Sequence, residues 1–296
     1  MSTTPKAAAT IIDCRPIRAE RKEALVTYIA SCAELGRAVP TLAIVQVGDR
    51  PDSTAFIKAK QKFADEIGAQ AVFKHLPETA SQRELVELVS AISADKSIHG
   101  VIVQLPLPLH LNKDEIIDAI HPSKDVDGLT SHNTKALWEG KENCITPATA
   151  RGVLEIFDYQ NISLEGKHVV MMGRSSLVGK PVALSCLHRG AAVTIVHTKT
   201  ENPQAITKSA DVLIVAIGKP HFVTKDYVSE GQIVIDIGIT PIDQGGKIKT
   251  AGDVDSEGIK NIVSAYTPVP YGVGQMTVLA LFENLIDAHQ RQYGKM

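Results

Sequence analysis

Short apolar runs alternate along this chain with segments whose apolar residues recur at helical spacing. In the first half, apolar runs occur at residues 41–47, 71–76 and 100–105. The segments between these runs carry apolar residues three or four positions apart, as amphipathic helices do. This alternation is typical of helices packed on a mostly parallel sheet, so the pattern predicts an α/β fold.

The helical segments have recognisable ends. The first helix is expected from Ile17 to Leu35 and the second from Ser53 to Ile67. A third opens at Ser81, which has capping-box spacing to Glu84. The last helix, Met276 to about Gln290, has one apolar side, which suits a return to pack on the first lobe.

A loop-rich segment divides the chain. Residues 121–149 are rich in Asn, Gly, Pro and charge, which indicates a crossover between two lobes. Beyond it, the apolar runs HVVMMG, AAVTIVH, DVLIVAIG and IVIDIG alternate with helical stretches, as in a dinucleotide-binding lobe. We expect one domain at 1–145, completed by the C-terminal helix 272–296, and a second, Rossmann-like domain at 146–271.

Composition narrows the class of protein. A chain of 296 residues is longer than most chains that fold around a single hydrophobic core, which supports two domains. Hydrophobic residues at 44% and a formal charge of -2 describe an ordinary globular protein without a basic surface, so no nucleic-acid partner is expected. No apolar run reaches signal-peptide or membrane-spanning length, so we expect no membrane partner and a cytoplasmic location. The four cysteines are far apart and lack CxxC spacing, which predicts neither a zinc site nor disulfides.

A lysine interrupts the apolar side of the second helix. Phe56, Phe63 and Ile67 mark an apolar stripe that passes through Lys60. A buried lysine needs a partner or a lowered pKa, which makes Lys60 a candidate for acid–base chemistry. The alternative, which the stripe taken alone favours, is that its methylenes cover the core while the ammonium reaches water.

Two polar motifs follow the strand at 100–105. Gln104 ends that strand, where ligands of α/β sheets collect, and it can accept from an ammonium, donate to a substrate or cap the loop. In KDVDG, alternate carboxylates point to opposite sides, so one of Asp125 and Asp127 is expected to face a site while the other caps the loop. DxDG also resembles calcium loops, but the other ligand positions are absent, so no metal is predicted.

The turn after the first strand of the second lobe suits a phosphate. GRSSLVGKP at 173–181 lacks GxGxxG spacing, but it lies between a strand and a helix, where free N–H groups point at an anion. About 20 residues on, where NAD enzymes offer a carboxylate, the chain has His197, Thr198 and Lys199. Together with Arg174, this favours the 2′-phosphate of NADP over NAD. Alternatively, Arg174 and Lys199 are solvated surface charges.

Glycines mark the turns of the same lobe. Gly218 and Gly238 each follow an apolar strand, where a residue without a side chain lets the backbone pass close to a ligand. A plain turn uses glycine equally well, so both interpretations stay open.

At this point the chain resembles the methylenetetrahydrofolate dehydrogenase/methenyltetrahydrofolate cyclohydrolase family over nearly its whole length. The motifs that carry the resemblance are VGDRPDS, the helix with Lys60, VIVQLPLP, HPSKDVDG, PATARG, GRSSLVGKP, IDIGI, GDV and TPVPYGVGQMT. The resemblance implies two α/β lobes around a cleft, the second binding NADP, and a homodimer formed through that lobe. It also implies oxidation of 5,10-methylenetetrahydrofolate with NADP, followed by hydrolysis to 10-formyltetrahydrofolate, with the first domain binding folate.

The resemblance assigns roles to individual residues. It implies that Lys60 is the central catalytic residue, that Gln104 positions it and that Asp127 anchors the pterin. Contacts with the tetrahydrofolate substrate are expected for Ser53, Phe56, Leu105, Pro106, Pro270 and Tyr271. Contacts with NADP are expected for Gly173, Arg174, Ser175, Val178, Gly179, His197, Thr198, Gly218 and Ile239, the last in the nicotinamide pocket.

Two departures from the family pattern motivate alternatives. Phe56 stands where the family has tyrosine, and Tyr271 and Gln275 lie in a loop that usually reads PGGVGPMT. The first alternative is a dehydrogenase with weak or absent cyclohydrolase activity. The second is a non-catalytic folate- or nucleotide-binding protein, which the joint presence of Lys60, Gln104 and Asp127 disfavours.

Overall fold

The computed structural model describes residues 9–141, 144–243, 245 and 248–294, and these form two compact units. Unit 1 contains the described part of residues 1–18 and residues 149–277. Unit 2 contains residues 19–148 and the described part of 278–296. The sequence pattern had grouped the N-terminal residues with the first domain. In the structure residues 9–18 belong to unit 1, because Thr10 and Ile11 pair with Ala265 and Tyr266 of its sheet.

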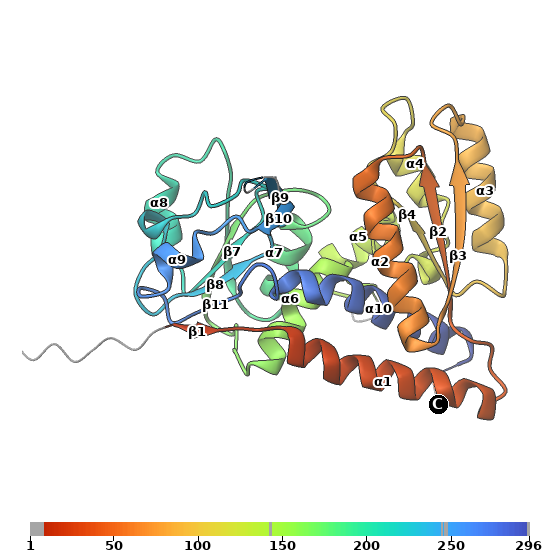
Figure 1. The fold of residues 1–296 in the computed structure, drawn as a ribbon, viewed down its shortest axis with the longest axis horizontal. Helices are drawn as coiled ribbons and strands as arrows, with labels where there is room; N and C mark the ends of the chain where they lie inside the picture. The colour runs from red at the N-terminus through yellow and green to blue at the C-terminus, as the bar shows by residue number, and fades with distance from the viewer. Residues whose placement is uncertain (1–8, 142–143, 244, 246–247, 295–296) are drawn as a thin grey trace, which may run out of the picture. The chain divides into compact units, whose positions relative to one another are not determined.

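Unit 2 is built on a small parallel sheet (Figure 1). Its strand order is β3-β2-β4, with β2 in the centre. The strands are β2 (Thr41–Val47), β3 (Gln70–Leu76) and β4 (Gly100–Val103). The helices of this unit are most of α1 (Arg15–Glu34), α2 (Pro51–Ile67), α3 (Gln82–Ala94), α4 (Lys113–Asp118), η1 (Pro122–Lys124), α5 (Ser131–Trp138) and most of α10 (Met276–Gln292).

The two faces of this sheet pack against different helices. Alternate residues of a strand point to opposite faces, and Ala43, Val45 and Val47 of β2 share a buried cluster with residues of α3 and α4. On the other face, Phe63 of α2 packs against Phe282 of α10, with ring centroids 5.3 Å apart. The C-terminal helix therefore supplies part of the core of unit 2, although it comes last in the chain.

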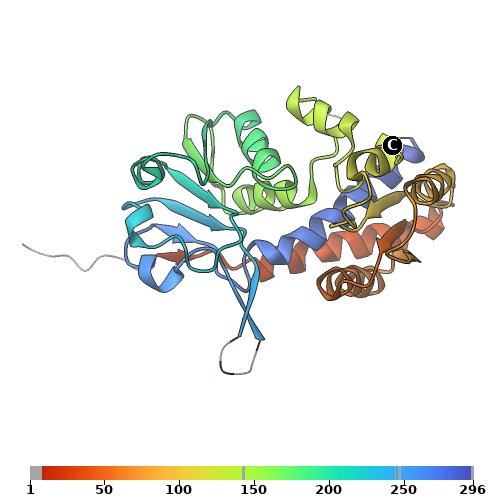
Figure 2. The same ribbon diagram turned by 90° about the horizontal axis from the view of Figure 1, so that it is seen from above.

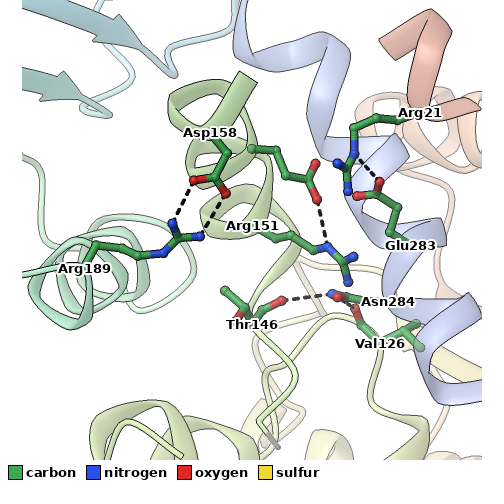
Figure 3. A network of polar contacts seen from close by, with 9 residues as sticks. Arg21, Val126, Thr146, Arg151, Asp158, Arg189, Glu283 and Asn284 are labelled. Carbon is green, nitrogen blue, oxygen red and sulfur yellow. Dashed lines mark hydrogen bonds and ion pairs between the residues drawn. The ribbon is translucent and has the colours of Figure 1, made fainter. Parts of the chain in front are cut away.

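Polar contacts fasten α10 within unit 2. Asn284 donates from Nδ2 to the backbone oxygens of Val126 and Thr146, at 2.8 and 2.9 Å (Figure 3). Val126 lies between the two aspartates of the KDVDG motif. Helix α10 therefore holds the backbone of that motif in place.

Unit 1 is built on a larger sheet. Its order is β1-β11-β8-β7-β5-β6, and every pair in it is parallel. The strands are β1 (Thr10–Ile11), β5 (His168–Met172), β6 (Ala192–Val196), β7 (Val212–Val215), β8 (Ile233–Asp236) and β11 (Ala265–Tyr266). From β5 onward this is a doubly wound order in which the chain reverses direction at β5, so a ligand site is expected beyond the carboxyl ends of β5, β6 and β7.

Helices cover both faces of this sheet. Figure 2 shows α7 (Gly179–His188), in green, on one side and α9 (Ser256–Ile259), in blue, on the other. The remaining elements of unit 1 are α6 (Ala148–Tyr159), α8 (Pro203–Lys208), η2 (Lys225–Tyr227), η3 (Val273–Gln275) and a hairpin of β9 (Thr240–Asp243) and β10 (Ile248–Ala251). The apolar pattern did not predict this hairpin, because its residues are mostly exposed and include a proline.

The α/β class predicted from the alternating pattern is confirmed, and so is the capping box. The side chain of Ser81 accepts from the backbone N–H of Glu84, whose carboxylate accepts in return from Ser81 N. Leu25, Ile29 and Cys32, which recur at helical spacing, are buried on one side of α1. Over the described part of the chain, every helix is too short or too polar to span a membrane.

Candidate functional site

The first candidate site lies in unit 2, where α2 and the end of β4 bring two polar side chains together. Lys60 Nζ donates to Gln104 Oε1 over 2.9 Å. The amide nitrogen of Gln104 donates to the backbone oxygen of Leu105 over 2.9 Å. That second bond fixes the orientation of the amide, so its oxygen faces the amine. Gln104 therefore fills two of the roles left open by the sequence, acceptor for a lysine and cap of the loop.

Lys60 and Asp127 influence each other electrostatically. Burial lowers the pKa of Lys60, and the charge of Asp127 opposes part of that shift. Burial also raises the pKa of Asp127, which the charge of Lys60 partly offsets and that of Asp125 reinforces. Both shifts favour neutral forms. A lysine whose pKa is lowered offers more free amine near neutral pH, which general-base chemistry requires.

The two aspartates of KDVDG divide their tasks. The carboxylate of Asp125 is buried and accepts from the backbone N–H groups of Leu129 and Thr130 and from the side chain of Asn133. Asp125 therefore caps the loop, which leaves Asp127 as the member of the pair coupled to Lys60. The predicted capping role is confirmed for Asp125.

The apolar stripe on α2 is shorter than the sequence predicted. Phe63 and Ile67 are buried, but the side chain of Phe56 is 53% exposed. The reason is topological. Helix α2 runs antiparallel to β2, so its first turns lie at the carboxyl end of the sheet, beyond the hydrophobic core. Lys60 is partly buried, between the exposed Phe56 and the buried Phe63.

The other expected substrate residues of unit 2 lie near this amine in the chain. Ser53 is buried in the first turn of α2, one turn before Phe56. Leu105 is partly buried and Pro106 is exposed, directly after Gln104. The structure therefore joins Lys60 to Gln104 by a hydrogen bond and to Asp127 by an electrostatic interaction, and it leaves Phe56 and Pro106 exposed.

The second candidate site is a cavity of about 370 Å³ in unit 1. It lies beyond the carboxyl ends of β5, β6 and β7, where the topology predicts a ligand. Its lining residues are Met172, Gly173, Arg174, Ser175, Val196, His197, Thr198, Thr200, Pro203, Ala216, Ile217, Lys219, Phe222 and Tyr227. Five of the expected cofactor residues are in this set: Gly173, Arg174, Ser175, His197 and Thr198.

The remaining expected cofactor residues are not part of this lining. Val178 and Gly179 begin α7, where their backbone N–H groups donate to Ser175 Oγ. Gly218 lies between the lining residues Ile217 and Lys219, and Ile239 packs over Gly274. Lys199 is exposed outside the lining, whereas the sequence reasoning missed Lys219, whose only signal was its position after Gly218.

Close backbone approach explains the glycines of the loop. Gly173 has φ of 122°, and a Cβ atom there would lie 2.2 Å from the backbone oxygen of Ala216. A Cβ atom on Gly179 would lie 2.4 Å from the backbone oxygen of Gly173. Any larger residue at either position would push the start of α7 away from β5 and β7, and would deform the cavity.

The comparisons with known proteins agree with this layout. The model of the tetrahydrofolate dehydrogenase/cyclohydrolase catalytic domain matches residues 12–127, and that of the corresponding NAD(P)-binding domain matches residues 147–293. The chain belongs to the tetrahydrofolate dehydrogenase/cyclohydrolase family.

Relatives within this family cover almost the entire chain. A Bifunctional protein FolD from Streptococcus agalactiae is 46% identical over 88% of this chain and 93% of its own. Another, from Anoxybacillus flavithermus, is 41% identical over 97% and 99%. The crystal structure of FolD from Campylobacter jejuni has a TM-score of 0.92 at 39% identity, over 96% and 99% of the two chains. FolD from Trypanosoma brucei, complexed with NADP cofactor and inhibitor, has the same TM-score at 30% identity, over 97% and 99%.

This member of the tetrahydrofolate dehydrogenase/cyclohydrolase family has an unusual loop in unit 1. Tyr271 has φ of 87°, a conformation that favours glycine. The guanidinium of Arg15 lies 4.3 Å from the centroid of its ring, and Cys14 N donates to its backbone oxygen over 2.8 Å. The peptide bond between Val269 and Pro270, directly before Tyr271, is cis. Two contacts from the start of α1 thus hold Tyr271 in place.

Proposed function

We propose that this protein oxidises 5,10-methylenetetrahydrofolate to 5,10-methenyltetrahydrofolate with NADP, and then hydrolyses that product to 10-formyltetrahydrofolate. The observation that carries the proposal is the partly buried amine of Lys60, which is hydrogen-bonded to Gln104 and coupled electrostatically to Asp127. The same chain has the cavity of unit 1, which Arg174 lines. A protein that only binds folate has little use for an amine with a lowered pKa.

The hydrolytic step is assigned to unit 2. Water adds to the methenyl carbon, and the free amine of Lys60 accepts a proton from that water. The tetrahedral adduct then collapses: the bond from carbon to N5 breaks, N5 takes a proton, and the hydroxyl loses its own as the formyl carbonyl forms. Gln104 keeps the amine in position through its oxygen. Asp127 is proposed to hold the pterin by accepting a hydrogen bond from its edge.

The oxidation is assigned to the cavity of unit 1. Bound NADP supplies the hydride acceptor for the methylene carbon. The lining suits the phosphorylated cofactor, because Arg174 and Lys219 are cationic and the described lining contains neither Asp nor Glu. An NAD enzyme would offer a carboxylate to the ribose hydroxyls. Thr198, two residues after the end of β6, is proposed to assist Arg174 at the 2′-phosphate, and Ile239 to lie beside the nicotinamide.

A homodimer through unit 1 is part of the proposal. Strand β6 is the last in the order of the sheet, and Ile195 on it is 40% exposed. An exposed edge with apolar residues suits pairing with a second copy. Light scattering during size-exclusion chromatography tests this, and a monomer at micromolar concentration would contradict it. A cytoplasmic location belongs to the same proposal, and cell fractionation tests it.

One assay tests the activity. Purified protein is mixed with methylenetetrahydrofolate and either NADP or NAD, and reduced cofactor, methenyl product and formyl product are followed separately. We expect NADPH to form and formyl product to accumulate, with NAD a much poorer acceptor. Methenyl product without hydrolysis above the uncatalysed rate would remove the cyclohydrolase half of the proposal. Absence of NADPH would remove the dehydrogenase half.

A further inference from the structure

A buried carboxylate behind the cofactor cavity organises one of its walls. Asp253, in the GDV motif, has no exposed surface. Its two oxygens accept from three consecutive backbone N–H groups, those of Ile217 at 2.7 Å, Gly218 at 2.9 Å and Lys219 at 2.7 Å. These residues form the loop after β7, and Ile217 and Lys219 line the cavity.

A second buried carboxylate holds the first. Asp236, the last residue of β8, accepts from the backbone N–H groups of Asp253 at 3.1 Å, Val254 at 2.9 Å and Gly238 at 2.9 Å. The loop after β7 is therefore tied to Asp253, and the backbone of Asp253 is tied to the end of β8.

The packing around the two carboxylates requires glycine at two neighbouring positions. A Cβ atom on Gly252 would lie 2.0 Å from an oxygen of Asp236, and one on Gly238 would lie 2.3 Å from the carboxyl carbon of Asp253. Both glycines are thus required for the carboxylates to reach their N–H partners. Their contacts also explain Gly238, which the sequence had left open between a ligand approach and a plain turn.

Stability alone does not account for this arrangement. Burial raises the pKa of Asp236 to about 6, although three N–H groups oppose the shift. Keeping that carboxylate ionised at neutral pH therefore opposes folding. Apolar side chains at this position would avoid the free-energy cost of a buried charge. They would not fix the direction of three successive N–H groups beside a ligand cavity.

We propose that Asp253, supported by Asp236, is a positioning residue for the cofactor: it fixes Ile217–Lys219 in the conformation that the NADP cavity requires. This inference rests on the proposed function for the identity of the ligand. Neither aspartate is assigned a contact with the cofactor or the substrate.

The main test replaces one carboxylate oxygen of Asp253 by an NH₂ group. Asp253→Asn keeps the shape of the side chain, but its NH₂ group cannot accept, so at least one of the three loop N–H groups loses its partner. We expect the dissociation constant for NADPH, measured by fluorescence titration, to rise about tenfold or more. The KM for NADP should rise likewise. Hydrolysis of methenyltetrahydrofolate, measured without NADP, should stay within about twofold, because Lys60 and Gln104 belong to unit 2.

A matched control is available in the same unit. Asp211 also accepts a backbone N–H, that of His168 at 2.8 Å, but at the amino end of β5, away from the cavity. Asp211→Asn should leave the dissociation constant for NADPH unchanged. If Asp253→Asn does not fold, Asp236→Asn, which acts one step further from the loop, is expected to weaken NADPH binding by a smaller factor.

The outcomes separate this inference from the proposed function. A folded Asp253→Asn protein that binds NADPH as tightly as the parent overturns the inference, as does a lowered melting temperature with unchanged binding. If Asp253→Asn fails to fold and Asp236→Asn binds normally, the inference is overturned too. If the parent binds NADPH but does not oxidise methylenetetrahydrofolate, the proposed activity fails while the positioning role remains open to the same titrations.

Discussion

Lys60 and Gln104 are separated by 44 residues, yet the amine of one and the amide oxygen of the other meet at 2.9 Å. Lys60 comes from the middle of α2, and Gln104 follows β4 directly. Because α2 follows β2, and β2 pairs with β4 in parallel register, the topology places both side chains toward the carboxyl ends of the strands. The pair is therefore a product of the parallel sheet of unit 2.

Replacing Lys60 by methionine should abolish hydrolysis of methenyltetrahydrofolate while the protein still folds. Methionine keeps the apolar stem and removes the amine, so the loss should be about 10²–10⁴-fold, as for other general acid–base groups. Lys58→Met, on the exposed side of the same helix, is the control and should hydrolyse at the parent rate. Unchanged hydrolysis in the Lys60 variant would remove the role assigned to this amine.

Replacing Gln104 by glutamate should move the pH dependence of hydrolysis. The parent should gain activity as Lys60 loses its proton, with a midpoint below the ordinary lysine value of 10.5, because burial lowers the pKa of Lys60. A carboxylate 2.9 Å away favours the ammonium, so the midpoint should shift to higher pH. Gln104→Leu, which removes the acceptor without adding charge, should shift it to lower pH. Identical pH profiles for all three proteins would contradict an effect of residue 104 on the pKa of Lys60.

Replacing Arg174 by alanine should reduce the preference for NADP over NAD. Loss of a charge-assisted bond to the 2′-phosphate should raise the KM for NADP roughly 10- to 100-fold and change the KM for NAD little. Lys208→Ala, an exposed cation on α8 outside the cavity lining, is the matched control. An equal rise in both KM values would show that Arg174 does not bind the 2′-phosphate of NADP.

Tyr271 offers a test of backbone strain. Tyr271→Gly and Tyr271→Ala both lose the contact with Arg15, but only glycine adopts φ of 87° without steric conflict. We expect the glycine variant to have a free energy of unfolding higher than the alanine variant by about 1 kcal/mol, measured with denaturant. Equal stabilities would mean that the loop relaxes and stores no strain.

Local patterns predicted the elements that bury apolar side chains. The strand runs, the capping box at Ser81 and the buried side of α1 all followed from spacing that involves only near neighbours. Phe56 belongs to the predicted apolar stripe but is exposed, because helical periodicity shows which side of a helix is apolar but not where the core ends along it. The β9–β10 hairpin was missed because its strands bury almost nothing.

The sequence by itself determined the α/β class, the family and the identity of the reactive candidates, since residue types and their order along the chain carry that information. Only the tertiary structure decided which groups interact. It paired Lys60 with Gln104, assigned Asp125 to the cap of its own loop, and joined Asp253 to a loop 34 to 36 residues away. The physical reason is that hydrogen bonds and pKa shifts depend on distances in space, which periodicity along a chain does not fix.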